Sequence, residues 1–290
     1  MQENKEIAAL LNLIDDPDED VFQTVSDKII SLGKDIIPNL ENLWETIHNE
    51  HTQERIESLI HRVHFRDLTD EFIQWKNDPV NDLIQGAIIV AKYHYPELNS
   101  LNLLQEIEKI RRNTWLELNS YLTAIEKVNV LNSILFSYYK IKSAEISYDS
   151  PDPFLINKTL ESRKGNGISL GILYAALCEL LDIPVSPVNI PRQFILAYFD
   201  EAYLHVGEES RAMEKIMFFI DPSNGQMYTH KDIESYFKRI SVPPVPSYFK
   251  PMPHKRCIQL MIEELSKCFN DLNNQYKMDE LNQLGDLLNE

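Results

Sequence analysis

The residues best suited to chemistry lie at the start of one strongly apolar helix, which the sequence predicts within residues 161–190. Gly165 and Gly167 allow a sharp turn and a close approach of the backbone just before this helix. Ser169 follows in the first helical turn, where free N–H groups and the helix dipole favour negative charge. This is the position that a nucleophile requires, and Ser169 would supply a hydroxyl there.

Other reactive side chains are spread along the rest of the chain. Cys178 lies about three turns into the same helix among leucines, a place typical of core packing. His205, in the acidic segment 200–213, and His230, at the start of a later helix, are the candidate bases for Ser169. A base must be held within about 3 Å of its nucleophile, and the sequence alone does not place either histidine there. Asp221 opens an Asp-Pro-Ser-Asn-Gly stretch, which is also what a tight turn uses.

The sequence predicts no metal site and no cofactor. No pair of histidines or cysteines has the spacing of zinc ligands, and His61 with His64 on a polar helix face is only a weak metal pattern. His94 has no partner four residues on and precedes a proline stop, so it is predicted to be structural. No glycine-rich phosphate loop is present.

Composition limits the class of protein that positions these groups. With 290 residues, 43% hydrophobic content and only 8 glycines, the chain can bury real cores and favours helix over sheet. A net charge of −17 disfavours nucleic acid and anionic membranes as partners, since both require clustered Lys and Arg. We expect no signal peptide and no membrane span. Three cysteines inside helical patterns indicate buried thiols and a cytoplasmic protein.

The order of apolar patterns predicts an α+β protein that is mostly helical at its N-terminus. Short amphipathic helices occupy residues 5–65, where the first repeat is similar to a HEAT-type helical repeat, and further helices follow in 67–95 and 101–139. After the central helix come β-prone runs at 185–190, 194–199 and 215–220, a helix at 230–239, a stiff spacer at 242–246, and a helical hairpin over 255–276 and 279–288. The predicted domains are a helical domain (1–145), an α+β domain (146–245) and the C-terminal hairpin (246–290).

Several motifs, taken in order, resemble the SirB-type transglutaminase-like family. They are DLIQGA at 82–87, NSILF at 132–136, LESRKGNGISL at 160–170, VNIP at 188–191 and FIDPSNG at 219–225. The resemblance runs from about residue 67 to the C-terminal helices. It implies a core of the papain-like superfamily, in which a helix bearing the nucleophile packs against a small antiparallel sheet.

The resemblance also implies where a catalytic triad would lie. In catalytic members of the wider superfamily a cysteine opens the central helix, a histidine begins the next strand and an aspartate follows on the strand after. Here the cysteine position is Gly167, or Ser169 with a shift of two residues, the histidine position is Gln193, and the aspartate position is Asp221. A glutamine amide cannot accept and return a proton near neutral pH, so the general base is replaced.

Two functions follow from these patterns. The first is a non-catalytic binding or regulatory module whose groove, with Asn166, Ser169, Gln193 and Asp221 as candidate contacts, holds a protein or peptide. The second is a hydrolase or acyltransferase with a rearranged site that uses Ser169 or Cys178 with His205 and Asp221. A third, pure scaffolding by the helical units, would leave the groove without a role.

Overall fold

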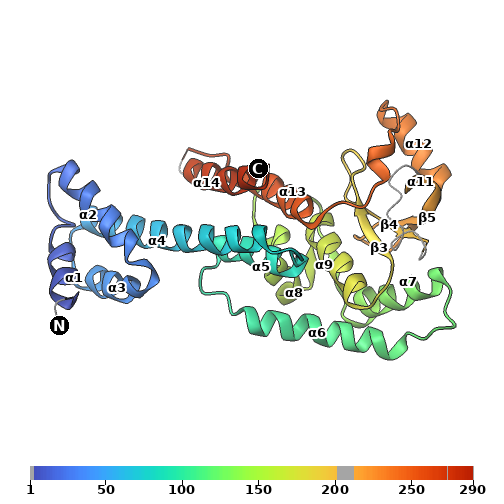
Figure 1. Cartoon of the computed structure of the whole chain (residues 1–290), viewed down its shortest axis with the longest axis horizontal. Coiled ribbons are helices and arrows are strands. Elements are labelled where there is room, and N and C mark those ends of the chain that lie inside the picture. Colours follow the sequence, from blue (N-terminus) through green and yellow to red (C-terminus); the bar gives the residue numbers. More distant parts are fainter. Residues whose placement is uncertain (1–2, 201–211, 273, 290) are drawn as a thin grey trace. The chain divides into compact units, whose positions relative to one another are not determined.

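The chain divides into two compact units, shown in a computed structural model that describes residues 3–200, 212–272 and 274–289 (Figure 1). The N-terminal unit is Met1–Gln74 with Lys92–Pro96, and the C-terminal unit is Trp75–Ala91 with Glu97–Glu290. This division differs from the domain boundaries expected from the sequence, because residues 97–145 and 246–290 belong to the unit that contains the sheet.

The N-terminal unit is helical. It contains α1 (Glu3–Asn12), α2 (Glu19–Ser31), the short 3-10 helix η1 (Gly33–Ile36), α3 (Ile37–Thr46) and most of α4 (Glu50–Asn77). Asp18 caps α2 by accepting a hydrogen bond from the Asp20 N–H. The apolar stripes of these helices meet in one core, which includes Ile14, Val25, Ile29, Leu40, Ile56, Leu59 and Val63. The helix α4 is continuous over 28 residues and joins the last apolar stripe of residues 5–65 to the helical stretch that the sequence predicted from residue 67.

The C-terminal unit holds the remaining elements. Its longer helices are α5 (Leu83–His94, up to Ala91), α6 (Ser100–Glu117), α7 (Ala124–Asn132), α8 (Ile156–Ser162), α9 (Gly167–Leu180), α12 (His230–Ile240), α13 (His254–Ser266) and α14 (Gln275–Asp286). Shorter helical turns are η2 (Ser133–Tyr138), η3 (Asp152–Phe154), α11 (Ala212–Lys215), η5 (Pro246–Phe249), η6 (Lys267–Phe269) and η7 (Leu287–Asn289). The strands are β1 (Lys142–Ser143), β2 (Lys164–Gly165), β3 (Val185–Val188), β4 (Ile195–Phe199), β5 (Ile216–Ile220) and β6 (Met227–Tyr228).

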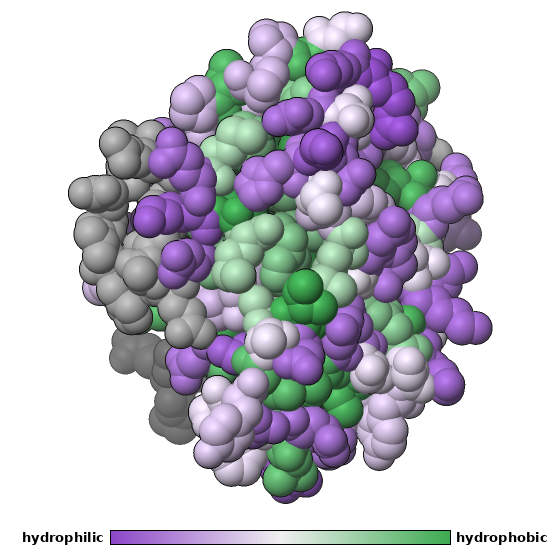
Figure 2. Space-filling view, turned by 90° about the vertical axis from the view of Figure 1, so that its right-hand side faces the viewer, coloured by the Kyte–Doolittle hydropathy of each residue, from purple (hydrophilic) through white to green (hydrophobic). Residues whose placement is uncertain are grey.

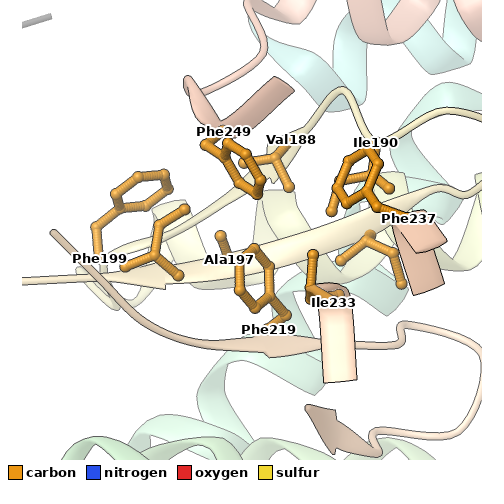
Figure 3. Packing of buried hydrophobic residues seen from close by; sticks show 10 residues of the cluster. Val188, Ile190, Ala197, Phe199, Phe219, Ile233, Phe237 and Phe249 are labelled. Carbon is orange, nitrogen blue, oxygen red and sulfur yellow. The ribbon is translucent and has the colours of Figure 1, made fainter. Parts of the chain in front are cut away.

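The sheet is antiparallel, with strand order β3-β4-β5-β6. All five residues of β4 are buried, because both faces of the sheet are covered. On one face, α9 contacts β3 and β4. On the other, Ile233 and Phe237 of α12 and Phe249 of η5 pack on Phe219 and its neighbours (Figure 3). The central helix on a small antiparallel sheet, as expected from the sequence, is confirmed.

The sequence missed some short elements. The strand β6 pairs with β5, and β1 forms a two-residue parallel pair with β2. The first arm of the C-terminal hairpin ends its α-helix at Ser266, ten residues before the predicted end. The C-terminal hairpin packs closely on another helix of its unit. A Cβ placed on Gly86 would lie 2.8 Å from Ile258 of α13, so α5 and α13 pack with almost no space between them.

The surface carries both polar and apolar side chains. Figure 2 shows apolar residues gathered across the middle of the face on the right of Figure 1, with polar residues around them. None of the helices in the part of the chain that the structure describes is long and apolar enough to cross a membrane.

Candidate functional site

The N-terminus of α9 is capped by the side chain of Asn166. The Asn166 side chain is fully buried, and its Oδ1 accepts hydrogen bonds from the N–H groups of Ile168 (3.0 Å) and Ser169 (3.1 Å). These bonds satisfy two of the free amides that a helix N-terminus exposes. Asn166 is therefore a buried capping residue, and the first residue of the helix, Gly167, is the one that reaches the surface in part.

Gly167, Gln193 and Asp221 line one groove of about 530 Å³, called here the central groove. The three positions that the resemblance assigns to a catalytic triad thus come together, although they lie on three separate elements. A Cβ built on Gly167 would stand 3.3 Å from the Ser223 hydroxyl oxygen, which also lines the groove. Position 167 therefore faces the groove, and a small side chain would nearly fit there.

Ser169 does not line this groove. Its side chain is 1% exposed, and its hydroxyl donates to the Pro153 carbonyl at 2.7 Å. The Thr159 hydroxyl lies 3.1 Å from the Ser169 hydroxyl oxygen. Gly165 leaves the space that this serine fills, because a Cβ there would lie 2.6 Å from the Ser169 oxygen. Of the two nucleophile positions considered from the sequence, the structure brings Gly167 to Gln193 and Asp221, whereas Ser169 is packed behind them.

Gln193 lies in the turn between β3 and β4 and is exposed. The preceding residue, Arg192, has a φ of 63°, in the left-handed region that non-glycine residues rarely adopt. The turn is held from two sides. The Gln193 N–H donates to the Ile190 carbonyl at 3.2 Å, and the Tyr236 hydroxyl of α12 donates to the Pro191 carbonyl at 2.8 Å. The carboxamide is thus presented to the groove on a fixed turn.

Asp221 directly follows β5 and organises the turn there. Its Oδ1 accepts from the Ser223 N–H at 2.8 Å, and its carbonyl accepts from the Gly225 N–H at 2.8 Å. Gly225 has a φ of 75°, which suits glycine at this point of the turn. Asp221 therefore does what its turn sequence predicts, and it also lines the central groove.

Asn132 connects this turn to α9, a role that the sequence did not reveal. Its side-chain Nδ2 donates to the Gly225 carbonyl at 2.9 Å, and its Oδ1 accepts from the Tyr174 hydroxyl at 3.0 Å. A Cβ on Gly225 would come within 2.4 Å of the Asn132 carboxamide, so only glycine allows this contact. The available signal was the position of Asn132 in the NSILF motif, but spacing alone gave no partner.

One wall of the groove comes from the segment that the sequence treated as a connection. Ile146 and Tyr148 line the groove, and the Tyr148 hydroxyl donates to Glu264 of α13 at 2.7 Å. Tyr148 also stacks on Phe154 with ring centroids 6.1 Å apart. The hydrogen bond to Glu264 and partial burial raise the pKa of Tyr148 above the usual tyrosine value. The Tyr148 phenol therefore stays protonated at physiological pH, beside the Glu264 side chain that also lines the groove.

None of the three cysteines is placed as a nucleophile in this groove. Cys178 is fully buried, and burial raises its pKa far above that of a free thiol. Burial also raises the pKa of Cys257 to about 12. Burial and the nearby charges of Asp149 and Glu264 raise the pKa of Cys268 to about 11. None of these thiols forms an appreciable thiolate near pH 7.

The histidine candidates are also placed, apart from His205, which lies outside the described residues. His230 at the start of α12 has its Nε2 3.3 Å from the Met213 carbonyl and its ring against Phe219. Over residues 3–200, 212–272 and 274–289, no group of three His, Cys, Asp or Glu side chains is arranged to hold a metal ion. His61 and His64 line a small cavity in the N-terminal unit.

Comparison with known proteins assigns the chain to a family. The chain belongs to the transglutaminase-like superfamily, whose family model matches residues 102–263. Protein SirB1 of Salmonella typhimurium is 23% identical over 184 residues, which cover 63% of this chain and 62% of that protein. The UPF0162 protein YchA of Escherichia coli K12 is 25% identical over 114 residues, 39% of this chain and 42% of that protein. The chain thus matches less than two thirds of the length of these relatives.

A relative matched over a shorter stretch is the F-box only protein 21 of Mus musculus, which is 28% identical over 71 residues, 24% of this chain and 11% of that protein. No solved structure shows significant similarity to the chain. The resemblance to the SirB-type transglutaminase-like family seen in the sequence is confirmed by these matches.

Proposed function

We propose that this protein is a binding or regulatory module that holds a protein segment or peptide in the central groove without catalysing acyl transfer. The observation that carries the proposal is the meeting of Gly167, Gln193 and Asp221 in one groove. A triad requires a nucleophile and a base at the first two positions, but glycine has no reactive group and a carboxamide does not shuttle protons. Asp221 alone cannot replace them.

The groove itself is suited to a peptide. Its volume of about 530 Å³ lies within the range of about 300–1,000 Å³ typical of ligand sites. Ile146, Met252 and Leu260 supply apolar surface, and Gln193 with Asn189 supplies amide groups that can both donate and accept hydrogen bonds. An extended peptide has backbone groups that both donate and accept hydrogen bonds, so it fits a groove lined by amide groups.

A hydrolase or acyltransferase with a rearranged site is the other candidate from the sequence, and the geometry supports it less. The Ser169 hydroxyl is buried outside the groove and donates to a backbone carbonyl, so it has no free path to a substrate. Cys178 is buried within α9. Neither side chain lines the central groove with Asp221, which that mechanism needs.

We also propose a cytoplasmic location. Its support is that Cys178, Cys257 and Cys268 are all free thiols, which persist in reducing compartments. Cell fractionation with an antibody against the chain tests it, and recovery of a disulfide-linked form from an oxidising compartment would contradict it.

Blocking the groove tests the binding role. The full chain is screened against an array of capped peptides, and the binders are then measured with the Ser223→Trp variant, which places an indole in the groove. Ser31→Trp, on exposed surface of the N-terminal unit, is the matched control. We expect binding to fall at least about tenfold for Ser223→Trp and to stay unchanged for Ser31→Trp. Equal binding by the two variants would show that the groove is not the binding surface and would favour scaffolding.

A further inference from the structure

A second cavity lies next to the central groove. It has a volume of about 420 Å³ and shares Ile190, Gln193 and Asp221 with the groove. The two spaces are therefore neighbours, with these three residues between them. We call the second cavity the tyrosine chamber, because Tyr228 of β6 and Tyr236 of α12 line it.

The lining of the tyrosine chamber combines aromatic rings with carboxylates. Asp221 and Asp232 line it together with the two tyrosines. The Arg239 guanidinium, which also lines it, lies over the Tyr236 ring with 5.3 Å to the centroid. This wall therefore already stabilises one cation by contact with a ring face. The two carboxylates and one guanidinium leave a net charge of −1 on the lining side chains.

The carboxylates are held by neutral groups. Asp221 accepts from the Ser223 N–H, and Asp232, in the first turn of α12, accepts from the N–H and hydroxyl of the capping residue Thr229. These hydrogen bonds position one oxygen of each carboxylate, and the donors carry no formal charge that would cancel that of the carboxylates. The negative charges act on Tyr228, which lines the same chamber. Its pKa is raised by burial first and then by the charges of Asp221 and Asp232. Charges that disfavour a phenolate at this point favour a cation there.

We propose that the tyrosine chamber binds the side chain of a lysine or arginine carried by the segment that occupies the central groove. The inference rests on the proposed binding function and specifies its ligand. A basic side chain would pass Gln193 and Asp221 and place its charge near the Tyr228 ring and the two carboxylates. The net charge of −17 on the chain adds long-range attraction for a basic partner.

The test compares four capped, fluorescein-labelled peptides of sequence Gly-Leu-Xaa-Leu-Gly, in which Xaa is Lys, Arg, Gln or Glu. Anisotropy measures their binding to the full chain. We expect the Lys and Arg peptides to bind about tenfold more tightly than the Gln peptide, and the Glu peptide to bind most weakly. Equal binding of all four would overturn the inference while leaving the binding function intact.

Isosteric variants locate the preference. Asp221→Asn keeps the acceptor for the Ser223 N–H and removes the charge, so the preference for Lys and Arg should fall below about threefold. Asp182→Asn, which lines a different cavity of the same unit, should leave the preference unchanged. A preference that survives Asp221→Asn in full would contradict the assignment.

If no peptide binds, the proposed function loses its support and the chamber is tested alone. Amide chemical shifts are then followed in NMR spectra during titration with n-butylguanidinium, with sodium butyrate as the control. Saturable shifts at Tyr228 and Asp232 with the cation only would sustain the chamber as a cation site. Absence of such shifts would overturn it.

Discussion

Gly167 and Gln193 define the chemistry of the groove by what their side chains lack. The Asn166 cap and the helix dipole are arranged as they would be for a reactive residue at position 167, yet that residue ends at its Cα. Ser223 and Asp221 are in place beside it. The site should therefore become reactive when two side chains are restored.

Restoring the pair is the first prediction. In a Gly167→Cys, Gln193→His double variant, the introduced thiol should be alkylated by iodoacetamide at pH 6 roughly tenfold faster than in Gly167→Cys alone. The reason is that a neighbouring imidazolium and a helix N-terminus lower the pKa of a thiol from about 8.5. Peptide mapping after alkylation over pH 5–9 measures the rate at the introduced thiol separately from the rate at Cys268. Identical pH profiles in the two variants would show that positions 167 and 193 are not within reach of each other.

A second prediction concerns Ser169. Replacing it by alanine should reduce the free energy of unfolding by about 1 kcal/mol, because the bond from the Ser169 hydroxyl to the Pro153 carbonyl is lost while the Asn166 N–H still donates to that carbonyl. Urea unfolding measures the change. Ser162→Ala, at an exposed serine that bonds within its own helix, serves as control and should cost no more than about 0.5 kcal/mol. A Ser169→Ala variant of unchanged stability that loses an enzymatic activity would contradict the structural role given to this serine.

At this scale the sequence predicted which positions come together but not how each one is oriented. The meeting of Gly167, Gln193 and Asp221 was expected from the resemblance. The choice between Gly167 and Ser169 was not predictable, because two residues along a helix change the direction of a side chain by about 200°. Only the positions of Pro153 and Thr159 show that Ser169 points inward.

Among the elements, α9 and the turn after β5 are joined through a residue of a third. Asn132 ends α7 and bonds both the Gly225 carbonyl and the Tyr174 hydroxyl. This bridge holds the Asp221 turn against the helix that carries Gly167. The geometry of the groove thus depends on a side chain that does not line it.

The third prediction follows from this bridge. Asn132→Ala should reduce the free energy of unfolding by about 1–3 kcal/mol, because it leaves the Gly225 carbonyl and the Tyr174 hydroxyl unpaired. Asn129→Ala, one turn earlier on an exposed position of α7, should change it by no more than about 0.5 kcal/mol. Combination of Asn132→Ala with Tyr174→Phe in a double-mutant cycle should show coupling, and strict additivity of the two changes would contradict the bridge.

Long periodic segments were the elements most readily predicted. The helix at 230–239 was found as α12 (His230–Ile240), and the three β-prone runs became β3, β4 and β5. The two-residue strands β1, β2 and β6 could not be predicted, since they arise from pairing with distant partners and carry too few residues for a pattern. The last apolar stripe before residue 65 and the helical stretch predicted from residue 67 form one helix, α4, because no glycine or proline interrupts the pattern between them.

Buried thiols link the stability of the whole molecule to pH, which is the fourth prediction. Cys178 and Cys257 stay protonated in the folded protein, whereas the unfolded chain loses these protons above about pH 8.5. Their contribution to stability is therefore complete below that pH and decreases as pH rises, by up to about 1.4 kcal/mol per pH unit for each thiol. Urea unfolding at pH 8, 9 and 10 under reducing conditions measures the slope. Cys178→Ala should make the decrease of the unfolding free energy with pH smaller by the share of one thiol. An unchanged slope in that variant would contradict the assignment of this pH dependence to the buried thiols.

For the molecule as a whole, the sequence predicted the α+β class and the family, but not the extent of each compact unit. The sequence predicted a stiff extended spacer at 242–246, yet Phe249, three residues after it, packs against Phe219 and Phe237 in the core of the sheet (Figure 3). A spacer pattern carries no information on what its aromatic residues contact. The HEAT-like character of the N-terminal helices stays a prediction, because no comparison tests it.

Labelling of the native full chain tests the central claim, a groove without a nucleophile, most directly. The protein is incubated at pH 7.5 with a fluorophosphonate or a thiol-reactive activity probe, and intact mass spectrometry counts the adducts. We predict no adduct that depends on the folded state. A stoichiometric adduct that disappears on denaturation and on a single substitution of Ser169, Cys178 or His205 would contradict this claim and would identify the protein as an enzyme with a rearranged site.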